Sequence, residues 1–240
     1  MTGPFLSPAL DRIKPSPTVA MTQRVGELKR AGVDVIGLSV GEPDFPTPGH
    51  IVDAATAAMR GGQTRYTDVD GSADLKAAIV RKFARENALD YDRAQISVGA
   101  GGKQVLFNAL IASIAPGDEV VIPAPYWVSY PDIVRFADGV PVPVATDADS
   151  GYKMSAEALA AALTPRTRWL ILNSPSNPTG TAYSADELRA FGDVLADYPD
   201  VLILSDDIYE HIWFPREPFA TIAAVCPALK DRTVTLNGVS

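Results

Sequence analysis

Two runs of apolar residues that end in polar side chains constrain the fold of this chain more than any other feature. Residues 201–204 (VLIL) lead through one serine into Asp206 and Asp207, and residues 169–172 (WLIL) lead into the loop SPSNPTG. Runs this short and apolar are typical of strands that are covered on both faces of a sheet. An acid after such a strand lies where open α/β sheets bind ligands, although Asp is also a favoured cap and turn residue.

Strands of this kind alternate with helical segments from residue 119 onward. The strands are expected at residues 119–123, 140–144, 168–173, 201–205 and 233–237. The alternation predicts an α/β fold with a mainly parallel sheet and helices on both faces. We expect an N-terminal arm and the start of a smaller domain at residues 1–45, and a large domain at residues 46–240.

The N-terminal part gives weaker signals. Residues 1–18 contain four prolines and few periodic apolar positions, which predicts an arm rather than a packed element. Helices are expected over residues 19–30, 50–60 and 72–87, and further strands over residues 34–40 and 95–98.

Composition narrows the partners of the protein. A net charge of −8, from 21 Lys and Arg residues against 29 Asp and Glu residues, argues against nucleic-acid binding. The single cysteine, Cys226, excludes an internal disulfide framework and fits a reducing compartment. No apolar run reaches membrane-spanning length. We therefore expect a cytoplasmic protein that acts on small molecules, with no membrane partner and no bound metal.

A glycine-rich turn at residues 99–103 is a candidate anion site. Gly101 and Gly102 open a strongly helical run, and backbone N–H groups at such a helix start can approach a phosphate. Lys103 is followed by Gln104, so the P-loop pattern is absent, and the third glycine of the dinucleotide pattern is absent as well.

Five ordered motifs link the chain to a known family. They are GEPDF at 41–45, GGKQ at 101–104, PYWVSY at 125–130, SNPTG at 176–180 and DDIYEH at 206–211. Together they resemble the fold-type I aminotransferases of the aspartate aminotransferase family, which use pyridoxal 5'-phosphate (PLP). The resemblance implies transamination between aspartate or glutamate and a 2-oxo acid, such as 2-oxoglutarate or oxaloacetate, through a PLP Schiff base. GGKQ resembles the bacterial subgroup that includes prephenate aminotransferases, so an aminotransferase for prephenate or of broader specificity is the alternative.

The resemblance assigns two catalytic residues. Asp206 would face the ring nitrogen of PLP and keep it protonated, because a protonated ring withdraws electrons more strongly. Tyr209, together with Asn177, would donate a hydrogen bond to the phenolate oxygen of the cofactor. Trp127 would stack on the ring, although an aromatic residue there could equally belong to the core.

The same resemblance implies contacts from other parts of the chain. Gly101, Gly102 and Lys103 would hold the phosphate of PLP. Tyr66 would reach the cofactor phosphate of a neighbouring subunit, which implies a homodimer with shared active sites.

Substrate contacts are implied at five residues, namely Gly41, Thr18, Lys103, Trp127 and Asn177. The backbone around Gly41 would approach the α-carboxylate. Lys103, assisted by Thr18, would bind the distal carboxylate of an acidic substrate. Lys103 could also be an exposed lysine without a role, because most lysines lie on the surface.

The family's Schiff-base lysine follows the pattern TxNGxSK, and TLNGVS here runs to Ser240. We therefore expect that lysine directly after Ser240, followed by a C-terminal small domain. Two other classes of function stay open from the residues alone. One is a Mg²⁺-dependent phosphate enzyme with Asp206, Asp207 and His211 as ligands, and the other is a non-catalytic binding module.

Overall fold

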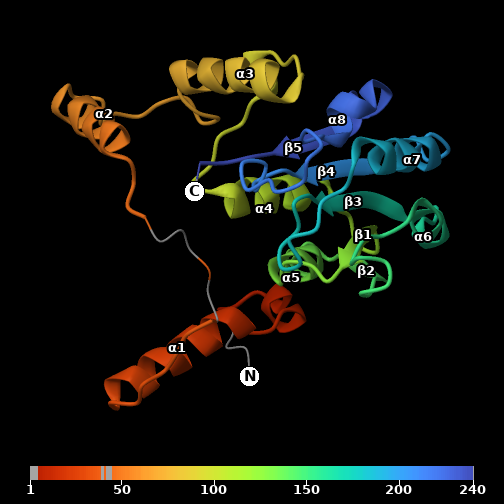
Figure 1. Ribbon diagram of the computed structural model, residues 1–240, viewed down its shortest axis with the longest axis horizontal. Helices are drawn as coiled ribbons and strands as arrows, with labels where there is room; N and C mark the ends of the chain where they lie inside the picture. Colours follow the sequence, from red (N-terminus) through yellow and green to blue (C-terminus); the bar gives the residue numbers. More distant parts are fainter. Residues whose placement is uncertain (1–4, 39–40, 42–44, 240) are drawn as a thin grey trace. The chain divides into compact units, whose positions relative to one another are not determined.

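The structure is a computed structural model that describes residues 5–38, 41 and 45–239 (Figure 1). These residues form two compact units. The first contains the described residues up to Lys14 and from Ala73 onward, and the second contains those between Pro15 and Ser72. The domain boundary expected between residues 45 and 46 remains a prediction. Within the described ranges, no helix combines the length and the apolar character needed to cross a lipid bilayer.

A five-stranded sheet forms the centre of the first unit. Its strands are β1 (Glu119–Ala124), β2 (Val140–Ala145), β3 (Thr167–Asn173), β4 (Leu202–Asp206) and β5 (Thr233–Leu236). They lie in the order β2-β1-β3-β4-β5, and every neighbouring pair is parallel. The predicted parallel sheet is confirmed, with each strand boundary within one residue of its expected position.

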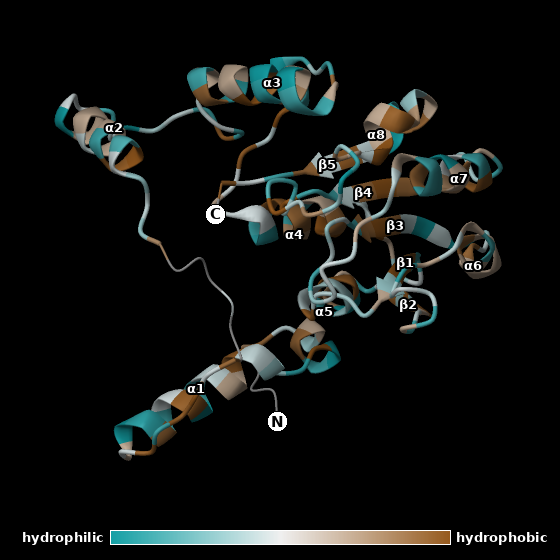
Figure 2. Ribbon diagram, in the orientation of Figure 1, coloured by the Kyte–Doolittle hydropathy of each residue, from teal (hydrophilic) through white to brown (hydrophobic). Residues whose placement is uncertain are grey.

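Helices cover both faces of this sheet. One face carries α4 (Gly102–Ser113) and α5 (Ser129–Phe136), and the other carries α6 (Ala156–Ala162), α7 (Ala185–Leu195) and α8 (Ile222–Val225). Along β3, Trp169 and Ile171 belong to the core with α4 and α5, whereas Leu170 and Leu172 belong to the core with α6, α7 and α8. Because both faces are buried, the middle of each central strand is hydrophobic, and Figure 2 shows brown ribbon along the first part of β4.

Serine caps explain where two of these helices begin. The Ser155 hydroxyl accepts a hydrogen bond from Ala158 N–H at the start of α6. Ser184 and Glu187 form a reciprocal capping box at the start of α7. Each pairing satisfies backbone N–H groups that the first helical turn leaves without a partner.

Four further elements complete the first unit: α3 (Ala73–Asn87), η1 (Pro8–Arg12), η2 (Arg93–Gln95) and η3 (Pro227–Arg232). Phe83 of α3 is buried in a small separate core with Leu89, Ile96 and Ala223. This core joins α3 to the segment that contains α8, and so places α3 beside the β4–β5 side of the sheet.

The chain reverses its direction across the sheet between β1 and β3. From β1 it passes through α5 to β2 at the edge, then returns through α6 to β3 on the other side of β1. Right-handed crossovers that run in opposite directions place α5 and α6 on opposite faces. The carboxyl ends of β1 and β3 therefore flank the position at which sheets of this kind bind ligands.

The second unit contains the helices α1 (Pro17–Arg30) and α2 (Gly49–Arg60), which confirms the helices predicted there. Neither helix has a buried residue. The Ser16 hydroxyl accepts a hydrogen bond from Val19 N–H and caps α1. Ile51 and Val52 of α2 are each about half exposed, so this helix shows an apolar surface within its own unit.

Two predicted strands are wrong. Residues 33–38 have no regular structure, and Ile36 and Leu38 are 87% and 91% exposed. A strand is held by hydrogen bonds to a neighbour, and no strand of the described chain pairs with this segment. The last two positions of that prediction, 39 and 40, lie outside the described residues. Residues 96–98 follow η2 and likewise join no sheet of the described chain.

Part of the expected N-terminal arm contacts α5. Residues 8–12 form the helix η1, and the Arg12 guanidinium donates to the carbonyl oxygens of Arg135 and Phe136 at the end of α5. Arg12 also forms an ion pair of 2.9 Å with Asp138. A cation at a helix C-terminus satisfies free carbonyl groups, which explains why this proline-rich segment packs.

Candidate active site

Asp206 is the last residue of β4, and its side chain is almost fully buried. Its Oδ2 accepts a 2.6 Å hydrogen bond from the Tyr130 hydroxyl, and its Oδ1 accepts a 3.3 Å bond from Ile208 N–H. Burial raises the pKa of Asp206, and these two hydrogen bonds offset part of the rise. Among the described residues no cation pairs with this carboxylate, so a cationic group of a ligand would be stabilised here.

Tyr130 is a site residue that sequence reasoning missed. It lies in the first turn of α5 and is 2% exposed. Burial and the charge of Asp206 raise the pKa of Tyr130, so its hydroxyl stays protonated and donates. The motif PYWVSY contained this residue, but 76 positions separate Tyr130 from Asp206, and no local pattern connects the two.

The loop after β3 reaches the same end of the sheet. Asn173 donates from Nδ2 to the backbone carbonyl of Asp206 at 2.9 Å, and its Oδ1 accepts from Asn177 N–H at 2.7 Å. Asn177 in turn donates from Nδ2 to the Tyr209 hydroxyl at 3.4 Å. The structure thus brings together two residues that were singled out from the sequence, and Asn173, which was not singled out, holds the loop in place.

The glycine-rich turn precedes α4. Gly101 is the N-cap residue with φ of +91°, a conformation that favours glycine, and no side chain caps the helix. A Cβ atom at Gly102 would lie 3.3 Å from Leu236, at the end of β5. Because no side chain caps α4, the backbone N–H groups at the start of this helix are open to an anion.

Lys103 and Trp127 lie against each other. The Lys103 ammonium is 4.8 Å from the centre of the Trp127 ring, and the Trp127 and Tyr130 rings meet edge to face at 5.4 Å. Lys103 is exposed, and Trp127 is partly buried against the core beneath α4 and α5. The predicted phosphate turn, the aromatic residue and Asp206 are therefore linked by successive contacts through Tyr130.

A pocket opens at the carboxyl ends of β1 and β3, where the chain reverses direction. Its walls include Tyr126 and Tyr130 from the segment after β1, and Asn173, Asn177 and Thr181 from the end of β3 and the loop that follows. Residues with hydroxyl and amide side chains, from the segments that follow both strands, thus line this pocket. The position is the one expected for a ligand site in a sheet with this strand order.

Asp207 points away from Asp206, because side chains alternate along the chain at the end of β4. Its Oδ1 accepts a 2.7 Å hydrogen bond from Ser205, and its Oδ2 has no partner among the described residues. Complete burial raises the pKa of Asp207 to about 7. This carboxyl group is therefore separate from the cluster around Tyr130.

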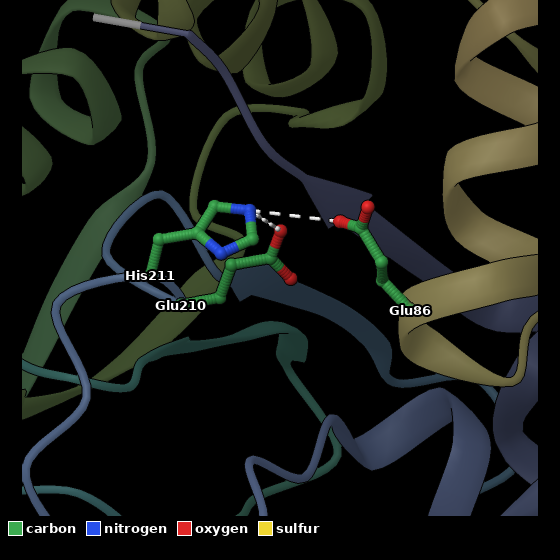
Figure 3. A group of neighbouring side chains, drawn as sticks. All are labelled: Glu86, Glu210 and His211. Carbon is green, nitrogen blue, oxygen red and sulfur yellow. Dashed lines mark ion pairs between the residues drawn. The ribbon is translucent and has the colours of Figure 1, made fainter.

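The ligand set of the magnesium hypothesis does not assemble. His211 contacts Glu210 at 3.2 Å and Glu86 at 3.6 Å (Figure 3), and these three are the described residues that come close enough to share a metal ion. Neither Asp206 nor Asp207 belongs to that group. The arrangement therefore does not support a metal site made by Asp206, Asp207 and His211.

Three predicted site residues lie in the second unit. Thr18 is in the first turn of α1 and is partly buried, Gly41 is exposed, and Tyr66 is fully exposed. Residues 42–44 of the GEPDF motif and Ser240 lie outside the described residues. The proposed roles of these three residues stay predictions.

Comparisons with known proteins identify the family of this chain. The family model described as "Aminotransferase class I and II" matches residues 33–240. The aspartate/prephenate aminotransferase of Cereibacter sphaeroides is 57% identical over 236 residues, which are 98% of this chain and 59% of the relative. The corresponding protein of Nitrosomonas europaea is 55% identical over 235 residues, again 98% of this chain and 59% of the relative.

Solved structures give the same result. The aspartate aminotransferase from Rhizobium meliloti matches with a TM-score of 0.95 and 50% identity, over 99% of this chain and 60% of that one. The aspartate aminotransferase from Thermus thermophilus with maleate matches with a TM-score of 0.93 and 42% identity, over 100% and 61%. The chain thus spans about three-fifths of the length of these relatives.

Proposed function

The chain belongs to the class I and II aminotransferases, and from that premise we propose that it forms the cofactor-binding part of a PLP-dependent aminotransferase. The reaction proposed is the transfer of an amino group between aspartate or glutamate and a 2-oxo acid, with prephenate as the alternative acceptor. The relatives named above carry both activities in their names, which supports the pair without deciding between them.

The observation that carries this proposal is the environment of Asp206. A buried carboxylate that has only neutral hydrogen-bond donors among the described residues fits the protonated ring nitrogen of PLP, which would supply the missing cation. The open helix start at Gly101 and Gly102 fits the phosphate group, because the helix has no side-chain cap. The site therefore offers a negative group for the protonated ring nitrogen of the cofactor and N–H donors for its phosphate.

When bound, PLP supplies an electron sink for the negative charge that develops at the substrate Cα. Asp206 would hold the proton on the ring nitrogen, and Tyr130 would keep Asp206 oriented. Asn177 and Tyr209 would donate to the phenolate oxygen, and Trp127 would cover the ring. Of these contacts, the structure supports the mutual placement of the protein groups, since Tyr130 binds Asp206 and Asn177 binds Tyr209.

An acidic substrate is proposed because of Lys103. Its exposed ammonium group lies over the Trp127 ring, where it could pair with the distal carboxylate. Thr18 would assist at that carboxylate, and the backbone at Gly41 and the side chain of Asn177 would bind the α-carboxylate. The maleate named for the Thermus thermophilus structure is a dicarboxylate, which supports this preference.

We further propose a homodimer with shared active sites, in which Tyr66 contacts the cofactor phosphate of the partner subunit. The complete exposure of Tyr66 within the chain supports this role, because its ring has no covering element of its own. We also propose the cytoplasm as the compartment. The single cysteine, which is a free thiol, supports a reducing environment.

The test is a titration with PLP of the protein as its gene encodes it, followed by absorption spectroscopy and a transamination assay with aspartate and 2-oxoglutarate. We expect a visible band from bound PLP that borohydride traps covalently. Asp206→Asn should retain the band and lose at least about a hundredfold in kcat, because a neutral amide cannot hold the ring proton. The exposed Asp186→Asn variant is the control. A protein without the band, or an Asp206→Asn variant within a few fold of wild type, would contradict the proposal.

A further inference from the structure

A closed hydrogen-bonded network joins α3 to the turn that follows β4. Glu210 is buried, and its Oε1 accepts a hydrogen bond from the Lys82 ammonium while its Oε2 accepts from Asn87 Nδ2 at 2.5 Å. Lys82 also donates to Asn87 Oδ1 at 2.7 Å. Each of the three side chains thus contacts the other two, and both carboxylate oxygens of Glu210 are satisfied.

Glu86 and His211 lie next to Glu210 (Figure 3). Their side chains are 30% and 73% exposed, whereas the side chain of Glu210 is 3% exposed. The two glutamates and the histidine could form a metal site by proximity alone. The Lys82 ammonium already provides the positive charge beside Glu210, so a metal ion is not needed to balance this carboxylate.

Glu210 follows Tyr209 directly in the chain, and the two side chains bind different parts of the structure. Tyr209 receives the hydrogen bond from Asn177, in the loop after β3, and Glu210 binds α3. Backbone bonds from Glu210 N–H to Asp207 and from Ile212 N–H to Tyr209 make the segment a tight turn. A displacement of Glu210 would therefore be passed to the phenol of Tyr209.

We propose that Glu210 is a positioning residue, which holds the Tyr209 hydroxyl at the cofactor oxygen by anchoring the turn to Lys82 and Asn87. The proposal rests on the proposed function. A buried carboxylate is stable only with paired charges and hydrogen bonds, so this network has one favoured geometry rather than several. Tyr209 has one long hydrogen bond, of 3.4 Å, among the described residues. Its position is therefore determined mainly by the turn.

The decisive variant is Glu210→Gln in the PLP-loaded protein, with Glu86→Gln as the control on the exposed side of the same network. We expect the pH midpoint of the visible band of bound PLP to rise by about one unit in Glu210→Gln. A shift of this size corresponds to the coupling energy that is typical of residues in contact. The midpoint rises because a phenolate oxygen that loses its donor holds a neighbouring proton more tightly. Glu86→Gln should leave the midpoint unchanged.

A double-mutant cycle separates positioning from a general loss of stability. In a Tyr209→Phe background, Glu210→Gln should produce no further shift of the midpoint, because the group through which it acts is absent. A shift of equal size in that background would overturn the proposal.

Should Glu210→Gln fail to fold, Lys82→Gln keeps one neutral donor to Glu210, and it should shift the midpoint in the same direction by a smaller amount. A folded Lys82→Gln variant without a shift would overturn the proposal as well.

The outcome also distinguishes this proposal from the proposed function. A wild-type protein that shows no visible band with PLP overturns both. A wild-type band that is present, and that does not move in Glu210→Gln, overturns the positioning role alone, whatever happens to the melting temperature.

Discussion

The Tyr130 hydroxyl donates a 2.6 Å hydrogen bond to Asp206 Oδ2 and so connects the first turn of α5 to the end of β4. Both side chains are buried, and burial opposes the charged form of each. The hydrogen bond favours the carboxylate of Asp206 over its protonated form, because a carboxylate is the better acceptor. Tyr130 therefore keeps a negative charge available at the position where the proposed reaction needs it.

Tyr130→Phe should remove this support. We expect the pKa of Asp206 to rise further and kcat to fall by about tenfold to a hundredfold, the cost of a hydrogen bond to a charged group. Because the active carboxylate would then form only at higher pH, the acidic limb of the kcat profile should move upward. Tyr91→Phe is the control, because it also removes a tyrosine hydroxyl that forms a hydrogen bond, here with Thr235 and outside the pocket. An unchanged profile in Tyr130→Phe would show that the bond has only a structural role.

Lys103→Ala should affect acidic substrates more than apolar ones. The variant removes the ammonium that lies over Trp127, and loss of a charge-assisted contact should reduce kcat/KM for aspartate by about tenfold to a hundredfold. Alanine has no distal carboxylate, so its kcat/KM should change little. Lys230→Ala is a matched control, because Lys230 also lies over an aromatic ring, that of Tyr91, outside the site. Equal losses with both substrates would argue that Lys103 serves only the phosphate.

A mixture of two inactive variants tests the shared active site. Asp206→Asn lacks the carboxylate, and Tyr66→Ala lacks the group that is proposed to act on the partner's cofactor. In a hybrid dimer both defects fall in one site and the other site is intact. Random exchange of subunits between equal amounts of the two variants should therefore restore about a quarter of the wild-type activity, measured at limiting PLP. Exchanging dimers that recover no activity would place Tyr66 in the site of its own subunit, and a Tyr66→Ala variant that is active by itself would place Tyr66 in no site.

The core of the fold could be predicted because its signals are local. Val201 to Leu204 and Trp169 to Leu172 are apolar over their whole length, which identifies strands that are covered on both faces. The segment around Ile36 and Leu38 has a similar appearance, and it was predicted wrongly because its strand character would depend on a partner elsewhere. Local patterns show that a segment can be a strand, whereas pairing decides whether it becomes one.

The site was predictable only in part for a related reason. Asp206, Asn177 and Tyr209 were identified because each lies in a motif at a strand end, but the contacts of Tyr130 and Glu210 join residues 76 and 128 positions apart. Side-chain identity gives no distance across such separations. Asp206 and Asp207 are the same residue type and adjacent in the sequence, so the sequence does not distinguish them. Their environments differ because their side chains point toward opposite faces of the sheet.

Asp207 gives the final prediction, which concerns stability and pH. In the folded state its pKa is about 7, above the ordinary value of 3.8, because the group is fully buried and Asp206 and Glu210 add negative charge nearby. The folded protein therefore binds this proton more tightly than the unfolded chain does. Its contribution to stability is fully present below pH 3.8, and it is lost as pH rises through 7, where the carboxyl group must ionise without a partner for Oδ2.

Asp207→Asn removes this titration and keeps the shape of the side chain. The free energy of unfolding of the variant, relative to wild type, should therefore increase by about 3 kcal/mol between pH 5 and pH 8. Urea unfolding of both proteins at a series of pH values measures the difference, in which the titrations of all other groups largely cancel. Asp186→Asn, which removes an exposed acid, should show a nearly constant difference across the same range. A constant difference for Asp207→Asn as well would mean that Asp207 ionises in the folded protein as readily as in the unfolded chain.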